Sequence, residues 1–507
     1  MTGRRLVLAL DQGTTSTRCL VFDAQGQMVS IAQREHRQHY PQPGWVEHDA
    51  LEIWALARKV ILRAMADAGA EPAEVVGLGL TNQRETTVIW DRTTGVPVHR
   101  AIVWQDIRTA DLLETFEAEM GEARIQARTG LPLATYFSAP KIRWMIDADP
   151  ALQEGLASGR LLFGTMDTWL VWNMTGGVDG GHHLTDATNA SRTMLMDLET
   201  LAWDPELLAL ARLPAAALPE IRPSIGAWPV TVDPVPGIPV AAVIGDQQAS
   251  LFGQTAFDAG DAKCTFGTGS FLLLNTGTEL VRSRHGLIST VACTREGEEP
   301  VYALEGAVAT TGALVQWCRD SLGLIRTPAE IETLAAGVED NGGCYVVPAF
   351  SGLFAPFWDP HAQGLIVGLT SYVTKGHIAR AVLESTAWQA RDLLEAMNAE
   401  AGVPARGLTV DGGMTSNNLL MQTMADLLDV PVVRPRMAET VALGAAFAAG
   451  LGVGLWPDQD ALRAKWQAAA VWRPDIDPAR RDAELARWRT AVRLSREWGQ
   501  QGVSPLP

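Results

Sequence analysis

The sequence predicts an α/β protein built from two domains of similar plan. Strand-like segments rich in Val, Leu and Ile alternate with helical patterns along the 507 residues. Two segments half a chain apart, LALDQGTTSTRCLVFD (8–23) and AKCTFGTGSFLLLNTG (262–277), share the order strand, Gly-Thr turn, strand. Such a repeat indicates two related domains that each direct a turn of the same kind towards a common cleft. We place the boundary near residue 252, which gives domains 1–252 and 253–507.

Composition excludes several classes of partner. The chain carries 41 Lys and Arg against 58 Asp and Glu, a formal charge of −17, which opposes binding to nucleic acid or to an anionic membrane surface. Its 47% of hydrophobic residues suffice for sizeable cores. The five cysteines are widely spaced without a CxxC pair, and we find no signal peptide and no apolar run long enough for a membrane span. A cytoplasmic protein without membrane insertion is expected.

The first hairpin, LVLALDQGTTSTRCLVFD at residues 6–23, concentrates hydrogen-bonding residues in its turn. Backbone N–H groups, hydroxyls and one guanidinium form an array of donors that suits a phosphate. These donors belong to Gly13, Thr14, Thr15, Ser16 and Arg18. Asp11 ends the first strand, and its acceptor-only carboxylate suits Mg²⁺ bound through water. The alternative is that Asp11 only braces the turn.

Two polar groups follow apolar strands in the first half. The stretch TNQRETTVIWD (81–91) sets Arg84 beside Glu85, where strand alternation places neighbours on opposite faces. A surface ion pair is the default for these two residues, and proximity to a substrate is the alternative. The stretch VIGDQQASLFG (243–253) puts Asp246 where a strand gives way to a helix. Asp246 is either the cap of that helix or a general base beside a cleft, and the phosphate turns favour the base.

Two further turns resemble the first in composition. They are FGTGS at 266–270 and VDGGMTSNN at 410–418, and the second precedes the apolar helical pattern LLMQTMADLL. We expect N–H groups at the start of that helix to face the turn as another anion site. Three turns rich in glycine and hydroxyls, each after a strand, together indicate a nucleotide whose phosphates lie between two domains. A Gly-Lys dipeptide and a GxGxxG motif are absent, which argues against a P-loop enzyme and a Rossmann dinucleotide enzyme.

Helices are readable in the second half. Residues 376–397 carry one apolar stripe, formed by Leu383, Ala387, Ala390, Leu394 and Met397. The segment 443–456 is built of Ala and Gly and predicts a tightly packed helix and its end. A final helix is expected after Asp477 as its N-cap and Pro478 as its first residue, with one apolar face formed by Leu485, Trp488 and Val492.

A series of motifs covers the chain from about residue 6 to the final helix. They are DQGTTSTR, PGWVEHD, TNQRETTVIWD, AIVWQD, TYFSAPKIRWM, FGTMDTWLVW, TDATNASRTMLMD, GDQQASLFGQ, CTFGTGSFLLLNTG, LEGAVATTGALVQW and VDGGMTSNNLLMQ. In this order they resemble the glycerol kinases within the FGGY family of carbohydrate kinases. NQRETT, SRTML and GDQQASLFGQ separate this subfamily from the xylulose and ribulose kinases. The resemblance implies two actin-like, ribonuclease-H-like domains with a nucleotide cleft between them.

The resemblance also implies roles for individual residues. Hydrogen bonds to the three hydroxyls of glycerol are expected from Arg84, Glu85, Tyr136, Asp246 and Gln247. Packing on the carbon backbone of glycerol is expected from Trp104 and Phe271. Contacts to ATP are expected from Thr14, Thr15, Ser16, Arg18, Thr268, Gly312, Gln316, Gly413 and Asn417. The expected metal ion is Mg²⁺, beside Asp11 and Asp246.

The implied reaction is in-line transfer of the γ-phosphoryl group of MgATP to a primary hydroxyl of glycerol, giving sn-glycerol 3-phosphate, with Asp246 as general base. One alternative is an FGGY kinase for a longer polyol or a ketose. A second is an actin-like ATPase module, which leaves the NQRETT and GDQQ residues without a task.

Regulation departs from the family pattern. Some members are inhibited by fructose 1,6-bisphosphate through a loop that carries a basic residue, but the stretch 231–245 has no Lys or Arg and Gly237 stands where arginine is expected. We therefore expect weak or no inhibition by this sugar, because a bisphosphate binds poorly without a cation. The resemblance implies a homodimer or homotetramer.

Overall fold

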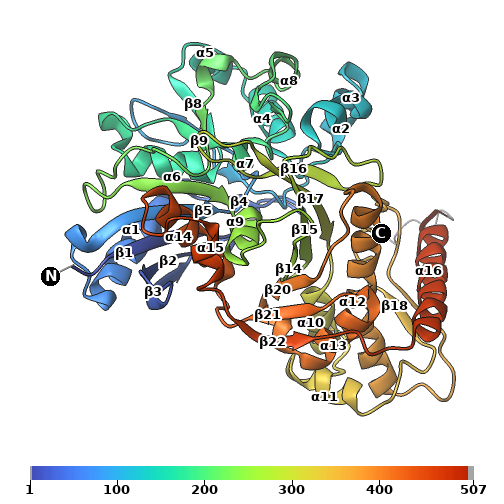
Figure 1. Cartoon of the computed structure of the whole chain (residues 1–507). Helices are drawn as coiled ribbons and strands as arrows, with labels where there is room; N and C mark the ends of the chain where they lie inside the picture. Colours follow the sequence, from blue (N-terminus) through green and yellow to red (C-terminus); the bar gives the residue numbers. More distant parts are fainter. Residues whose placement is uncertain (1–2, 501–507) are drawn as a thin grey trace.

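Two β-sheets of related design form the centres of the two halves of the chain, in a computed structural model that describes residues 3–500 (Figure 1). The first sheet has the order β13 (Val240–Gly245), β5 (Val75–Asn82), β1 (Leu6–Gln12), β2 (Ser16–Asp23), β3 (Met28–Glu35). The second has the order β16 (Ile288–Cys293), β17 (Val301–Val308), β15 (Ser270–Gly277), β14 (Ala262–Phe266), β20 (Leu408–Asp411), β21 (Val432–Pro435), β22 (Ala468–Trp472).

The pairing directions show the duplication that the repeated hairpin predicts. In the first sheet β1, β2 and β3 are antiparallel neighbours, and β5 and β13 then continue in parallel beside β1. In the second sheet β14, β15 and β17 are antiparallel neighbours, and β20 and β21 then continue in parallel beside β14. The expected α/β fold with two domains of similar plan is confirmed.

The central strands β1 and β5 of the first sheet are largely apolar because helices cover both of their faces, whereas the edge strand β3 is mostly exposed. The leucines of β1 lie in a core with α1 (Ala50–Ala68), while Val7 and Ala9 lie in a core with α14 (Thr440–Gly452). Strands buried on both faces read as continuous hydrophobic runs, which explains the sequence LVLAL.

Helix α14 comes from the last quarter of the chain and returns to the first sheet, beside α9 (Asp246–Gly253) (Figure 1). The expected tightly packed helix of Ala and Gly is confirmed. A Cβ atom on Gly444 would lie 1.8 Å from the carbonyl oxygen of Ala249, so only glycine permits this approach. The boundary near residue 252 falls in the last turn of α9 and stays a prediction.

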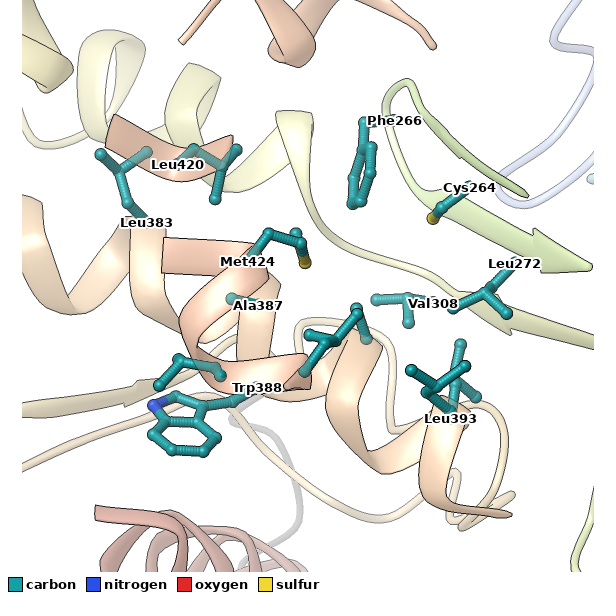
Figure 2. Close-up of a cluster of buried hydrophobic side chains, with 14 of the residues drawn as sticks. Cys264, Phe266, Leu272, Val308, Leu383, Ala387, Trp388, Leu393, Leu420 and Met424 are labelled. Atoms are coloured by element: carbon teal, nitrogen blue, oxygen red, sulfur yellow. The ribbon is translucent and has the colours of Figure 1, made fainter. Parts of the chain in front are cut away.

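The core of the second half lies between its sheet and helices α12 (Lys375–Glu400) and α13 (Asn418–Leu428). Figure 2 shows Leu383 and Trp388 of α12 gathered with Phe266 and Leu272 of the strands. All five residues of the predicted stripe are buried. The final helix, α16 (Pro478–Gln500), begins as predicted: Arg480 donates its N–H to Asp477 at 2.9 Å, and the apolar face Leu485, Trp488 and Val492 is buried.

The remaining helices and strands lie outside the two large sheets and the helices described above. The other helices are α2 (Ala110–Glu119), α3 (Glu122–Thr129), α4 (Ser138–Ala148), α5 (Leu152–Ala157), α6 (Met166–Met174), α7 (Ala187–Ala190), α8 (Pro205–Leu210), α10 (Gly312–Asp320), α11 (Glu330–Ala336) and α15 (Gln459–Arg463). The other strands are β4 (Glu47–His48), β6 (Val88–Asp91), β7 (Ala101–Ile102), β8 (Leu161–Gly164), β9 (Leu184–Asp186), β10 (Met196–Asp197), β11 (Ala202–Trp203), β12 (Glu220–Arg222), β18 (Tyr345–Val347) and β19 (Leu365–Val367). Most of them form an insertion between β5 and β13 that carries several of the predicted site residues.

All five cysteines are free thiols. None of the helices within residues 3–500 combines the length and the apolar composition needed to span a membrane.

Candidate active site

Three aromatic side chains predicted to contact a substrate lie together between the two halves. The ring of Trp104 lies 5.3 Å from that of Tyr136 and 6.2 Å from that of Phe271, centroid to centroid. Trp104 also donates its indole N–H to the hydroxyl of Thr14 at 3.0 Å. Because Phe271 belongs to the second sheet, this group joins the first turn to the second half of the chain and forms an apolar wall.

Arg84 and Glu85 are buried, so the surface ion pair expected by default is wrong. Only 2% of the Arg84 side chain and 1% of the Glu85 side chain are exposed. Glu85 has a positive φ of 61°, and Thr86 donates its N–H to the carbonyl of Arg84 at 2.6 Å, which closes a tight turn around Glu85. This conformation is strained for glutamate, and strained residues persist where surrounding contacts hold them. Here Arg192 donates from Nε to the Glu85 carboxylate at 2.6 Å.

Asp246 opens helix α9 at the end of strand β13, with its carboxylate beside Arg84. Gly245, not Asp246, occupies the N-cap position, so the capping role weighed for Asp246 is not observed. The Asp246 oxygen Oδ1 lies 3.2 Å from Arg84 Nε and accepts the N–H of Gln247 at 2.7 Å. About a quarter (26%) of the side chain stays exposed. Burial raises the pKa of Asp246, and Arg84 and Lys263 oppose that rise. The result is a carboxylate that is accessible, fixed in place and more basic than usual.

Lys263 fixes the orientation of Gln247. Its ammonium donates to Gln247 Oε1 at 2.5 Å and to the hydroxyl of Thr265 at 2.9 Å, and its side chain is buried. With the amide oxygen of Gln247 engaged, its amide N–H groups are the donors left for another partner. A single cation inside the apolar strand 262–266 is the sequence signal that could have identified Lys263.

Sequence reasoning also missed Arg192 and Glu305. Both side chains are buried, and both contact the predicted site: Arg192 holds Glu85, and Glu305 accepts from Arg84. Arg192 lies within the quoted motif SRTML, but its type and spacing alone name no partner.

Asp11 is buried and meets Arg18 across the first hairpin. Asp11 Oδ2 lies 2.9 Å from Arg18 Nε, and Arg18 Nη1 donates to Glu439 at 2.5 Å. Burial raises the pKa of Asp11 to about 6 against the attraction of Arg18, with Asp246 and Glu439 adding to the rise. The ion pair is poorly aligned as a hydrogen bond: among the described residues Asp11 Oδ2 has no well-aligned donor. The Asp11 carboxylate therefore faces a cation on the opposite strand of its own hairpin, and both roles weighed for it stay predictions.

The predicted nucleotide residues of the first turn differ in exposure. Thr14 accepts from Trp104 as described, Thr15 is exposed, and Ser16 accepts from Gln33 Nε2 at 3.1 Å.

In the second half, the turn at 267–269 and the start of α10 lie against each other. Gly312 donates its N–H to the carbonyl of Gly267 at 3.1 Å, and Ala313 donates to Thr268 at 3.0 Å. A Cβ atom on Gly312 would lie 2.4 Å from the Gly267 oxygen and 3.6 Å from the sulfur of Met414. The structure thus brings the predicted residues Thr268, Gly312 and Gly413 to one place. Gln316 is exposed on the next turn of α10.

The start of α13 corrects one expectation. The sequence predicts free N–H groups there for an anion, but Asn417 accepts the N–H of Leu420 at 2.8 Å and Glu332 accepts that of Leu419 at 3.0 Å. A short 3₁₀ helix, Gly413–Ser416, stands between the turn and α13. An anion would therefore meet the glycine turn rather than the helix end.

Two further findings concern a cavity of the molecule and the groups that could bind a metal ion. A cavity of about 520 Å³ opens between α4, α5 and α8, and none of the predicted site residues lines it. Within residues 3–500 we find no cluster of three His, Cys, Asp or Glu side chains placed to hold a metal ion.

Comparisons with known proteins agree with this architecture. Residues 6–253 match the model for the N-terminal domain of the FGGY family of carbohydrate kinases, and residues 262–453 match that for its C-terminal domain. The chain is 56% identical to glycerol kinase 2 of Streptomyces avermitilis over 498 residues, 98% of each chain.

Two solved structures show the same fold over nearly the whole length. One is a crystal structure of Plasmodium falciparum glycerol kinase with ADP, with a TM-score of 0.91, 35% identity and 99% of each chain covered. The other is xylulose kinase from Rhodospirillum rubrum, with a TM-score of 0.87, 24% identity and coverage of 98% of this chain and 100% of that one. The chain belongs to the FGGY family of carbohydrate kinases.

Proposed function

We propose that this chain transfers the γ-phosphoryl group of ATP to a primary hydroxyl of glycerol, forming sn-glycerol 3-phosphate and ADP. The observation that carries the proposal is the joint arrangement of an apolar wall (Trp104, Tyr136, Phe271) and a polar pair formed by buried Arg84 and partly exposed Asp246. A small polyol needs both, because each hydroxyl must find a partner once it is buried. The identity to curated glycerol kinases over nearly the whole chain supports the same substrate.

The acceptor hydroxyl loses its proton to Asp246 in this proposal. The raised pKa of Asp246 favours that role, since a stronger base accepts a proton more readily, and its partial exposure leaves it accessible. Arg84 and Gln247 supply donors to hydroxyl oxygens, and Glu85 supplies an acceptor to a hydroxyl hydrogen. Little covalent chemistry falls to the protein, so positioning and exclusion of water account for most of the catalysis.

The phosphates of ATP lie between the two turns in this proposal. Thr14, Thr15, Ser16 and Arg18 approach them from the first half, and Thr268, Gly312, Gln316, Gly413 and Asn417 contact the nucleotide from the second half. That a Plasmodium glycerol kinase of the same fold was solved with ADP supports the binding of an adenine nucleotide.

We propose Mg²⁺ as the metal, held by Asp11 and Asp246 together with the phosphates. The buried Asp11 oxygen without a well-aligned donor fits this assignment. Mg²⁺ usually takes only one or two carboxylates and completes its shell with water and phosphate, so a larger acidic cluster is not required. When bound, the ion neutralises phosphate charge and offsets the repulsion between Asp11 and Asp246.

Compartment, assembly and regulation stay predictions. We expect a cytoplasmic homodimer or homotetramer, with weak or no inhibition by fructose 1,6-bisphosphate. In the loop where the family carries a basic residue, Gly237 has a φ of +85°. The cation that does reach this loop, Arg58, is paired with Asp233, with 3.0 Å between Arg58 Nε and Asp233 Oδ2. A titration of fructose 1,6-bisphosphate against the initial rate tests this expectation, and strong inhibition contradicts it.

The experiment that tests the function is ADP release by the purified chain with MgATP and different acceptors. The acceptors are none, glycerol, dihydroxyacetone, erythritol and D-xylulose. Strong dependence on glycerol supports the proposal. Preference for a longer polyol or ketose keeps the mechanism and changes the substrate, and release that needs no acceptor indicates an actin-like ATPase module.

A further inference from the structure

Glu305 is a buried glutamate in β17 that contacts two arginines of the other half of the chain. Its side chain is 0% exposed. Oε2 accepts from Arg84 Nη1 at 2.5 Å, and Oε1 accepts from Arg84 Nη2 at 2.9 Å and from Arg192 Nη2 at 3.1 Å. The paired bonds to Arg84 are the bidentate arrangement that fixes the plane of a guanidinium as well as its position.

This arrangement decides which N–H groups of Arg84 remain for a substrate. Arg84 has five N–H groups, and three of them donate to Glu305 and Gln248. The two left are on Nε and Nη2, and Nε lies toward Asp246. Glu305 therefore turns the free edge of the guanidinium to the side of the site where the proposed general base lies.

The Glu305 carboxylate is also linked to Glu85, through Arg192. Arg192 donates to Glu305 from Nη2 and to Glu85 from Nε, so Glu305 and Glu85 hold one guanidinium between them. Burial alone would raise the pKa of Glu305, but Arg192 and Arg84 outweigh burial and hold it at about 2. Glu305 is thus ionised at neutral pH.

Stability does not explain such a group. Buried ion pairs are costly to desolvate, and well-packed apolar residues of similar volume often serve stability equally well. Four buried charged side chains at the edge of the predicted substrate site instead indicate a task in recognition.

We propose that Glu305 is a positioning residue for the polyol: it aligns Arg84 directly and Glu85 through Arg192, so that their polar groups meet the hydroxyls of glycerol. The inference rests on the proposed function of this site. It does not make Glu305 a contact of the substrate.

The test compares the full-length wild type with Glu305→Gln and Glu305→Asp. Glutamine keeps the shape of the side chain but loses its charge, so we expect glycerol affinity, measured by calorimetry without nucleotide, to fall about 10- to 100-fold. The KM for glycerol should rise by a similar factor, while the KM for MgATP stays within about twofold. Aspartate keeps the charge on a shorter stem and should restore part of the affinity.

The matched control is Glu384→Gln. Glu384 is a buried glutamate of α12 that accepts from Arg380 at 2.8 Å and touches none of the predicted site residues. The Glu384→Gln substitution should lower the melting temperature, while the affinity for glycerol stays at the wild-type level.

The outcomes are distinguishable. Wild-type glycerol affinity in a folded Glu305→Gln variant overturns the inference, and so does an equal loss of affinity in Glu384→Gln. If Glu305→Gln does not fold, the Glu305→Asp variant decides. Weaker glycerol binding with an unchanged KM for MgATP supports a positioning role for Glu305. Equal changes in glycerol affinity and in the KM for MgATP refute it. If the wild type itself does not bind or phosphorylate glycerol, the proposed function fails before Glu305 is tested.

Discussion

Replacement of Asp246 by asparagine removes the proposed general base with little change in shape. The asparagine side chain would keep an oxygen for the Gln247 N–H, which Asp246 accepts at 2.7 Å, and the position is partly exposed, so the fold should persist. General-base catalysis contributes about 10²- to 10⁴-fold, so Asp246→Asn should lower kcat by that factor, equal to about 3 to 5.5 kcal/mol of barrier.

The assay is the initial rate of ADP release with saturating glycerol and MgATP, together with circular dichroism and a melting curve to establish folding. Asp458→Asn is the matched control, because Asp458 is an exposed N-cap of α15 and asparagine caps a helix equally well. That control should keep wild-type turnover. A folded Asp246→Asn enzyme with near-normal kcat refutes the assignment of Asp246 as the base.

Three other changes probe the nucleotide turn, the metal carboxylate and the core. Gly312→Ala places a Cβ atom 2.4 Å from the Gly267 oxygen, so the turn must shift and the KM for MgATP should rise at least about tenfold, with glycerol affinity measured by calorimetry unchanged. The pKa of Asp11 rises from 3.8 to about 6, so folding without nucleotide favours the protonated carboxyl group. The stability that this protonation contributes is therefore complete below pH 3.8 and is lost as the pH rises through 6. MgATP affinity has the opposite sign, since it needs the carboxylate, and calorimetric titration should find it about tenfold weaker at about pH 5 than at about pH 7; a flat profile contradicts the role of Asp11. Met424→Ala empties a fully buried site between α13 and the second sheet and should cost about 2–5 kcal/mol, seen as a lower melting temperature with retained kcat in surviving folded protein.

Much of the architecture was predictable because its signals are local. The stripe from Leu383 to Met397 and the cap at Asp477 depend on residues within a few turns of one another, and both are found as expected. The duplicated hairpins were predictable for the same reason, since each Gly-Thr turn lies between its own two strands.

The site was predictable only in part. Resemblance selected residues whose side chains do gather, such as Trp104, Tyr136 and Phe271. Strand alternation was misleading at Arg84 and Glu85, because strand β5 ends at Asn82 and a tight turn follows at Glu85. Both side chains are buried there against the distant residues Arg192 and Glu305. The expected anion site at the start of α13 failed because Glu332, far away in the sequence, accepts the N–H of Leu419, and the cap Asn417 accepts that of Leu420.

The α/β class, the repeated hairpin with its hydroxyl-rich turn and the apolar faces of the long helices can all be derived from the amino-acid order, because periodicity and turn chemistry act over a few residues. The partners of the buried charges, in contrast, follow only from the three-dimensional packing. Arg84 meets Glu305 221 positions away, and Arg192 joins Glu85 to Glu305 across both halves. Residues so far apart in the sequence form no local pattern from which their pairing could be predicted. Only the packing of the two sheets brings their side chains within hydrogen-bonding distance.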